Sequence, residues 1–157
     1  MKLAWSKKVT AHLAPNIIRI INRATQFTSF VCHSILEQTD VNIRAQVLKH
    51  WVFVAEKCRM LHNYNSLMAI TAGLMSSSIH RLQRCWRTIT RKEMTVFEDV
   101  KNLMSYQRNF GSYRKALKSA QLPALPFLGT TESRQNAFFS FFWLLFLKKF
   151  HNSQAST

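Results

Sequence analysis

The residues of this chain that could do chemistry are its histidines, its cysteines and a small set of acids. There are six histidines, but no G-x-S-x-G motif presents a serine as an activated nucleophile. All seven acids stand at positions typical of helix caps or solvated helix faces: Glu37, Asp40, Glu56, Glu93, Glu98, Asp99 and Glu132. General acid–base catalysis needs such a group beside a reacting atom. We therefore expect no bond-making active site.

Metal and nucleotide sites are also unsupported. Cys58 and His62 are four residues apart and could share one helix face, but a structural metal site takes four ligands. Cys58 also falls on an apolar stripe, so a buried free cysteine is the favoured interpretation. Neither G-x-x-x-x-G-K-[ST] nor G-x-G-x-x-G occurs. We expect no metal and no cofactor.

The charge balance is strongly basic, with 22 Lys and Arg against 7 Asp and Glu and a formal net charge of +15. This charge favours an acidic partner: nucleic acid, an anionic membrane surface or an acidic protein face. Four arginines at helical spacing would form one positive stripe on a helical stretch, namely Arg81, Arg84, Arg87 and Arg91. A solvated face is the more ordinary interpretation. Nucleic acid is disfavoured, because the aromatic residues fall at core spacing and not among these arginines.

Length and composition predict one domain in a reducing compartment. The 157 residues suffice for a hydrophobic core, and 3 Gly with 3 Pro leave few turns, so long helices are expected. Cys32, Cys58 and Cys85 are too few and too scattered for a disulfide framework. The N-terminus holds no apolar run long enough for a signal peptide. We expect a cytoplasmic protein, with recruitment to a membrane left open.

Apolar periodicity predicts an all-α fold. Pro15 opens a first helix, and Asp40 caps a second. A third helix, capped by Asn65 or Ser66, is rich in small residues and should be central. A capping box at Thr90 and Glu93 starts a further helix, and Asn109 caps the last. The second helix should turn one continuous apolar stripe to the core: Ile43, Val47, Trp51, Val54, Cys58 and Leu61.

Composition changes after Gly129. A polar segment leads into the apolar run Ala137 to Leu147, AFFSFFWLLFL. About 20 apolar residues are needed to cross a bilayer, so this run is too short. It could be a short core helix, a membrane-surface helix or sequence foreign to the fold. We divide the chain into a domain at 4–129 and a Phe-rich tail at 130–157.

The stretch from Asn42 to Leu82 resembles the core of the Ras-type guanine nucleotide exchange factor (RasGEF) catalytic domain. The family pattern has an Arg-Ala pair opening a long helix, then W-V-x-V-A-x-x-C-R, N-[FY]-N-S and S-S-x-I-x-R-L. These stand here as Arg44-Ala45, Trp51 to Arg59, Asn63 to Ser66, and the serines before Ile79 with Arg81-Leu82. AWSKK and LAPNI upstream, with NFGSYRKAL and LPFLG downstream, extend the match to Ala4–Gly129.

The resemblance implies a helical domain that is not an enzyme. It would promote GDP release from a Ras, Rap or Ral type GTPase by binding its switch regions, through linkage between two ligands. The implied GTPase contacts are Ile21, Asn22, Thr25, Met68, Ala72, Met75, Ser77, Phe110 and Phe127, and the implied structural supports are Asn63, Asn65 and Arg81.

The chain also departs from the family pattern. Met75 stands where the family often has Asn, and Ser78 where Pro is common. After Gly129 the family continues with Y-L-x-D-L and a helical hairpin that pries the first switch from the nucleotide, and no such motif follows here. We expect a truncated or alternatively spliced chain that binds its GTPase weakly and exchanges nucleotide poorly. The alternative is a basic helical module for acidic membrane or nucleic acid, without exchange activity.

Overall fold

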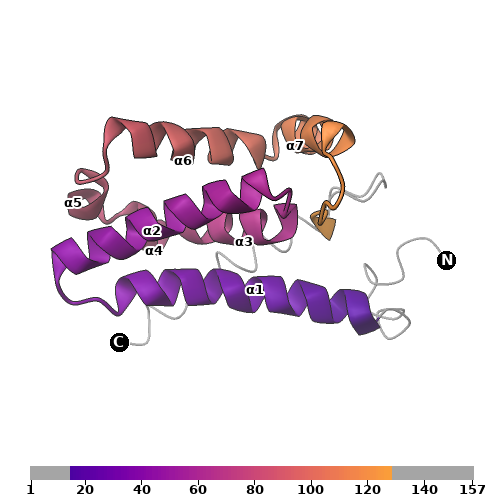
Figure 1. Cartoon of the computed structure of the whole chain (residues 1–157). Helices are drawn as coiled ribbons and strands as arrows, with labels where there is room; N and C mark the ends of the chain where they lie inside the picture. The colour runs from indigo at the N-terminus through magenta and orange to yellow at the C-terminus, as the bar shows by residue number, and fades with distance from the viewer. Residues whose placement is uncertain (1–14, 129–157) are drawn as a thin grey trace.

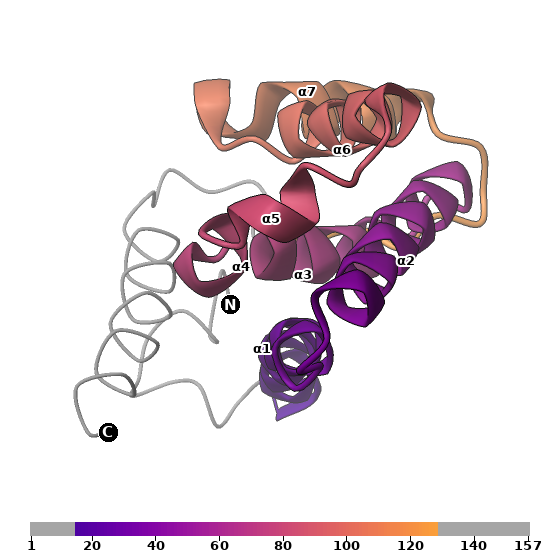
Figure 2. The same ribbon diagram turned by 90° about the vertical axis from the view of Figure 1, so that its left-hand side faces the viewer.

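The computed structural model describes residues 15–128, and every regular element in that range is a helix (Figure 1). The all-α prediction is therefore confirmed for this part of the chain. A view turned by 90° places α1 at one end, α6 and α7 at the other, and α3 and α4 between them (Figure 2). The helices are α1 (Pro15–Leu36), α2 (Val41–Met60), α3 (Tyr64–Leu74), α4 (Ser77–His80), α5 (Gln83–Trp86), α6 (Arg91–Leu103) and α7 (Gln107–Ser119).

Three predicted helix starts are confirmed. Pro15 is the first residue of α1, where its missing amide proton costs no hydrogen bond. The Asp40 carboxylate caps α2 by accepting hydrogen bonds from the backbone amides of Asn42 and Ile43, at 2.8 and 3.0 Å. Thr90 and Glu93 form a complete capping box on α6, each side chain accepting the other residue's backbone amide proton.

Two predicted caps were wrong. Asn63, not Asn65 or Ser66, caps α3, because its side-chain oxygen lies 3.1 Å from the Ser66 amide while Asn65 and Ser66 are already helical. Asn109 lies inside α7, in a left-handed segment with φ of 54°. Its neighbours Arg108 and Phe110 are in the same region, so the chain bends over these three residues and Asn109 does not cap the helix.

The predicted arginine stripe is not one helical surface. Arg81 is the C-cap of α4, Arg87 is the C-cap of α5, and Arg91 is the first residue of α6. The backbone changes direction between these positions, so helical spacing in the sequence does not produce a common face. None of the described helices combines the length and apolarity needed to cross a membrane.

The face of α2 that enters the core differs from the predicted one. Its buried residues are Ala45, Leu48, Trp51, Val52 and Ala55. Of the predicted stripe, only Trp51 is buried. Ile43 and Leu61 are 50% and 73% exposed, and Val47, Val54 and Cys58 are half-buried. The face that enters the core is the one covered by the neighbouring helices α1, α3, α5 and α6, and apolar spacing alone does not show which face they cover.

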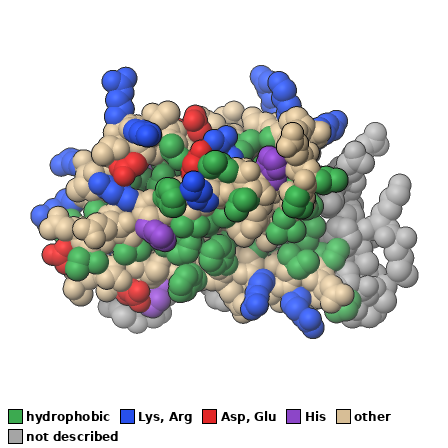
Figure 3. Space-filling model, in the orientation of Figure 1, with side chains coloured by type: hydrophobic (Ala, Val, Ile, Leu, Met, Phe, Trp, Pro, Cys, Tyr) green, Lys and Arg blue, Asp and Glu red, His purple; other side chains and the backbone are tan. Residues whose placement is uncertain are grey.

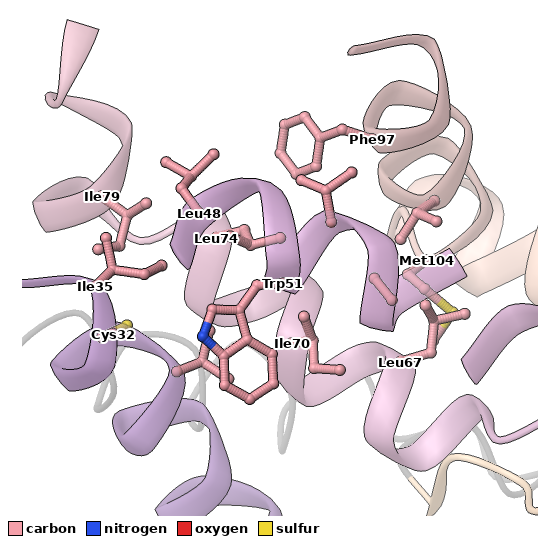
Figure 4. Close-up of a cluster of buried hydrophobic side chains, with 14 of the residues drawn as sticks. Cys32, Ile35, Leu48, Trp51, Leu67, Ile70, Leu74, Ile79, Phe97 and Met104 are labelled. Atoms are coloured by element: carbon pink, nitrogen blue, oxygen red, sulfur yellow. The ribbon is translucent and has the colours of Figure 1, made fainter. Parts of the chain in front are cut away.

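The core lies where α1, α2, α3 and α6 meet (Figure 4). Leu48, Leu67 and Ile70 have no solvent exposure. Trp51 closes the core on the α1 side, and its indole N–H donates to the Ser34 hydroxyl at 2.8 Å. That bond satisfies the one polar atom of the indole, so the ring can be buried without an unpaired donor.

Helices α1 and α3 approach each other closely at Gly73, which has nearer neighbours than Gly111, the other described glycine. A Cβ placed on Gly73 would lie 2.9 Å from a Val31 methyl carbon and 3.3 Å from the Thr28 carbonyl oxygen. The second neighbour is backbone and cannot rotate away. Gly73 therefore sets how near the two helices lie.

We expect Gly73→Ala to destabilise the chain by up to about 2 kcal/mol. Overpacking costs about 1–3 kcal/mol and the higher helix propensity of alanine returns about 1 kcal/mol. Urea unfolding would measure the change in midpoint. In a Val31→Ala background the same substitution should cost less, because the nearest methyl is gone. An equal cost in both backgrounds would contradict this explanation.

Candidate functional site

The candidate contact residues of α1 and α3 line one seam between two parallel helices. The Thr28 hydroxyl donates to the Ala69 carbonyl at 3.0 Å, and the Cys32 thiol to the Gly73 carbonyl at 3.5 Å. Both pairs are 41 residues apart, so the helices run in the same direction. The buried Thr28 and Cys32 hydrogen bonds fix the register of the seam.

On α1, the predicted contacts lie in the two turns before Thr28. Ile21 and Thr25 are half-buried and Asn22 is exposed. The Thr25 hydroxyl donates to the Ile21 carbonyl at 3.1 Å, so its polar group is satisfied within the helix. Of the three predicted contacts on this stretch, only Asn22 is exposed, and Arg23 and Gln26 of the same two turns are exposed as well.

On α3, each predicted contact comes one position before a residue that faces α1. Met68 and Ala72 precede Ala69 and Gly73, which contact α1. Because a helix turns about 100° per residue, Met68 and Ala72 lie on the adjacent face and remain half-exposed. They form the α3 rim of the seam.

The end of α3 turns Met75 and Ser77 outward. Met75 is the C-cap of α3 and is 40% exposed, and Ser77 is exposed. Between and after them, Ser76 and Ser78 are buried and their hydroxyls lie 3.1 Å apart. Ser76 also lies 3.4 Å from the Cys32 sulfur, and burial raises the pKa of that thiol despite this hydrogen bond. The buried Ser76 and Ser78 thus stabilise the turn, and the exposed side chains of Met75 and Ser77 are available for contact.

The Phe110 and Phe127 rings are in contact, with their centroids 5.7 Å apart, but they are not equally exposed to solvent. Phe110 is 5% exposed, whereas Phe127 is half-buried. Phe110 therefore packs on the inner side of Phe127, and of the two rings only that of Phe127 is appreciably exposed to a partner. Both rings belong to the far end of the domain, at α7 and the segment after it.

A strap formed by residues 121–128 connects that end to the start of α3. The Tyr64 amide donates to the Leu125 carbonyl at 2.9 Å, and the Leu125 amide to the His62 carbonyl at 3.0 Å. The Tyr113 hydroxyl accepts from the Phe127 amide at 2.9 Å and lies 3.3 Å from the Phe127 carbonyl. The sequence analysis missed Tyr113, because nothing in the spacing of its neighbours distinguishes it from an ordinary core tyrosine.

The predicted supports are placed as follows. Asn63 caps α3 and pairs with Leu125 in an isolated bridge, so it holds both the turn and the strap. Asn65 is half-buried in the first turn of α3. Arg81 is exposed and its amide donates to the Ser77 carbonyl at 3.2 Å, which closes α4.

The nine candidate contact residues carry no formal charge. Five of the six acids in the described part of the chain act elsewhere. Asp40 caps α2, and the other four form the ion pairs His33–Glu37, Lys49–Glu93, Glu56–Arg59 and Glu98–Lys101. The Arg59 guanidinium lowers the pKa of Glu56, and hydrogen bonds from Thr90 lower the pKa of Glu93. Within residues 15–128 no three His, Cys, Asp or Glu side chains gather as a metal site would require. The site can bind by shape and apolar contact.

Comparison with known proteins points to one family. The sequence profile described as RasGEF domain matches residues 1–141. The chain is 36% identical over 129 residues to "Ras guanine nucleotide exchange factor Y" of Dictyostelium discoideum, covering 82% of this chain and 9% of that protein. It is 37% identical over 126 residues to "Ras-specific guanine nucleotide-releasing factor RalGPS1" of Mus musculus, covering 80% of this chain and 22% of that protein. The chain therefore spans a small part of the curated relatives that it matches.

We expect Tyr113→Phe to loosen the strap while leaving α1 and α3 intact. Tyr113 is fully buried, and losing its hydroxyl removes the partner of the Phe127 amide, at a cost of about 1–2 kcal/mol. Hydrogen exchange of peptides covering 121–128 should accelerate, and exchange in α3 beyond its first turn should not. Tyr106→Phe, at an 81% exposed tyrosine, is the control and should change neither. Unchanged exchange in the strap of Tyr113→Phe would contradict this role.

Proposed function

The chain belongs to the RasGEF domain family, and we propose on that basis that it binds a Ras-family small GTPase and promotes the release of GDP from it. The observation that carries the proposal is the uncharged seam between α1 and α3. Exchange of this kind makes and breaks no covalent bond, so it needs no acid, base or metal. It needs a surface that binds one state of the partner better than another.

The proposed mechanism is thermodynamic linkage. If the chain binds the nucleotide-free GTPase more tightly than the GDP-bound form, GDP must weaken binding of the chain by the same factor that the chain weakens binding of GDP. Switch segments that order around phosphate are suitable targets, because a partner can stabilise their displaced conformation. Met68, Ala72 and Met75 along α3, together with Thr25 on α1, would hold such a segment through apolar contact.

Met75 gives the proposed contact a particular chemistry. A thioether cannot donate the two hydrogen bonds that an amide side chain offers, so contact here would be made by dispersion and area burial. Met75 is 40% exposed and ends α3, which places it where a docked segment would cover it.

A finer part of the proposal concerns the extent of exchange. We propose that this chain alone binds its GTPase weakly and accelerates GDP release poorly. The support is the sequence after Gly129, which carries no motif of the hairpin that the family resemblance assigns to opening the first switch. Release of a fluorescent GDP analogue from a panel of Ras, Rap and Ral proteins tests both parts. Strong acceleration would overturn the impairment, and no binding to any member would overturn the GTPase proposal.

We expect Met75→Glu to weaken binding to the nucleotide-free GTPase at least tenfold. Burying an unpaired carboxylate at the interface costs more than the 1.4 kcal/mol that a tenfold change represents. Biolayer interferometry with immobilised GTPase would measure it. Phe53→Glu is the control, because Phe53 is 57% exposed on α2 and lies outside the seam. Equal binding by the two variants would contradict the placement of the site.

A second candidate is a basic module that binds an acidic membrane surface. The observation that favours it is the exposure of four cations between α5 and the first turn of α6, although they do not share one helix face: Arg84, Arg87, Arg91 and Lys92. Each cation near an anionic bilayer contributes about 1 kcal/mol. Sedimentation with phosphatidylserine vesicles at physiological salt tests this candidate, and an oligonucleotide arm tests nucleic acid as the competing partner.

A further inference from the structure

The strap is held in place by hydrogen bonds to its backbone more than by burial of its side chains. Leu122 and Leu125 are 88% and 52% exposed. Residues 121–128 include no charged side chain, so no ion pair can fix the strap, and Lys and Arg lie mostly around the edges of the face seen in Figure 3. The groups that bond to its backbone therefore determine where Phe127, the one predicted contact residue of the strap, is held.

His62 bonds to the strap at two points. Its ring Nδ1 lies 2.9 Å from the Gln121 carbonyl oxygen, and its own carbonyl oxygen accepts from the Leu125 amide at 3.0 Å. A carbonyl oxygen can only accept a hydrogen bond, so Nδ1 carries the proton and donates it. The side chain and the backbone of one residue therefore fasten both the start and the middle of the strap.

The position of His62 is set by the end of α2. Its φ is 52°, in the left-handed region, where the chain passes from α2 to α3. Histidine, asparagine and aspartate enter this region more often than most other residues that carry a side chain. The His62 amide donates to the Arg59 carbonyl at 3.1 Å, which ties the residue to the last turn of the helix. His62 is thus a fixed anchor for the strap.

A row of aromatic contacts also leads from His62 to Phe127. The His62 ring stacks on that of Tyr64, with centroids 6.2 Å apart. Tyr64 meets Tyr113 edge-on at 5.2 Å, and Tyr113 meets Phe127 edge-on at 6.1 Å. Both tyrosines are buried, and rings in such pairs have preferred relative orientations, so they constrain one another. The Phe127 ring is therefore connected to His62 through the strap and through this row of rings.

We propose that His62 is a positioning residue for the GTPase contact made by Phe127, an inference that rests on the proposed function. His62 holds the strap at Gln121 and Leu125, and this keeps the half-buried Phe127 ring in one place before a partner docks. A surface ordered in advance avoids the cost of ordering it on binding. The effect of His62 on binding passes through Phe127 and not through a contact of its own with the GTPase.

Two substitutions separate the side-chain hydrogen bond of His62 from its backbone conformation. His62→Asn keeps a donor, because the amide nitrogen of Asn is bonded to Cγ as Nδ1 is, and Asn tolerates a positive φ. His62→Gly adopts the same backbone without strain and has no side-chain donor. Both variants should fold. His50→Asn is the control, because His50 is exposed in the middle of α2.

The first measurement is hydrogen exchange of peptides covering 121–128. Exchange in His62→Gly should be about fivefold faster than in the unaltered chain, the factor expected for one net hydrogen bond. His62→Asn and His50→Asn should exchange at close to the original rate. Recovery by Asn would show that the donor, and not the imidazole as such, holds the strap.

The second measurement is binding to the nucleotide-free form of whichever Ras, Rap or Ral protein of the panel binds most tightly. His62→Gly should bind about fivefold more weakly, and His62→Asn should restore binding. In a Phe127→Ala background, His62→Gly should have no further effect, because the residue that it positions has been removed. A purely structural role of His62 would not depend on Phe127 in this way.

Three outcomes would count against these conclusions. Unchanged strap exchange in His62→Gly would show that His62 does not hold the strap. Equal weakening of binding with and without Phe127→Ala would show that His62 does not act through Phe127. The exchange measurement contains no GTPase, so it separates the two proposals. Absence of binding by the unaltered chain would overturn the proposed function and the role of Phe127 in it, whereas the exchange result would still decide whether His62 holds the strap.

Discussion

The arrangement of this domain depends on how closely α1 can approach α3. Gly73 allows that approach, and the Thr28 and Cys32 side chains then donate to backbone carbonyls across the gap. These hydrogen bonds leave no buried hydroxyl or thiol unsatisfied, so the contact is both tight and specific in register. Six of the nine candidate contact residues lie on these two helices or at the C-cap of α3, so the shape of that part of the surface depends on this interface.

Local chemistry predicted the helix boundaries better than the helix faces. Asp40 and the Thr90–Glu93 capping box act within a few residues of themselves, and both were confirmed. The face of α2 depends on its neighbours, and periodicity indicates that a face is apolar without showing which side is covered. Ala45 and Ala55 lie on the buried face together with Leu48, whereas Ile43 and Leu61 remain exposed.

The candidate site was predicted from family resemblance, and its physical arrangement was not visible in the sequence. The residues Met68, Ala72 and Met75 follow helical spacing, which is equally typical of a buried face. What places them at the surface is the orientation of their neighbours Ala69 and Gly73 toward α1. Phe110 was predicted from the same resemblance and is buried, where its ring packs against Phe127, whose backbone is hydrogen-bonded to the Tyr113 hydroxyl.

The charge of the molecule and the neutrality of its seam have separate consequences for binding. A formal charge of +15 acts over roughly one Debye length, about 8 Å at physiological salt, and accelerates the encounter with an acidic partner. It cannot by itself distinguish two nucleotide states of that partner, because both carry nearly the same net charge at that range. Discrimination must come from contacts made only after docking, where uncharged side chains avoid the cost of removing an ion from water. In the proposed binding, the basic field would set the rate of association, and the seam between α1 and α3 would select the conformation that is bound.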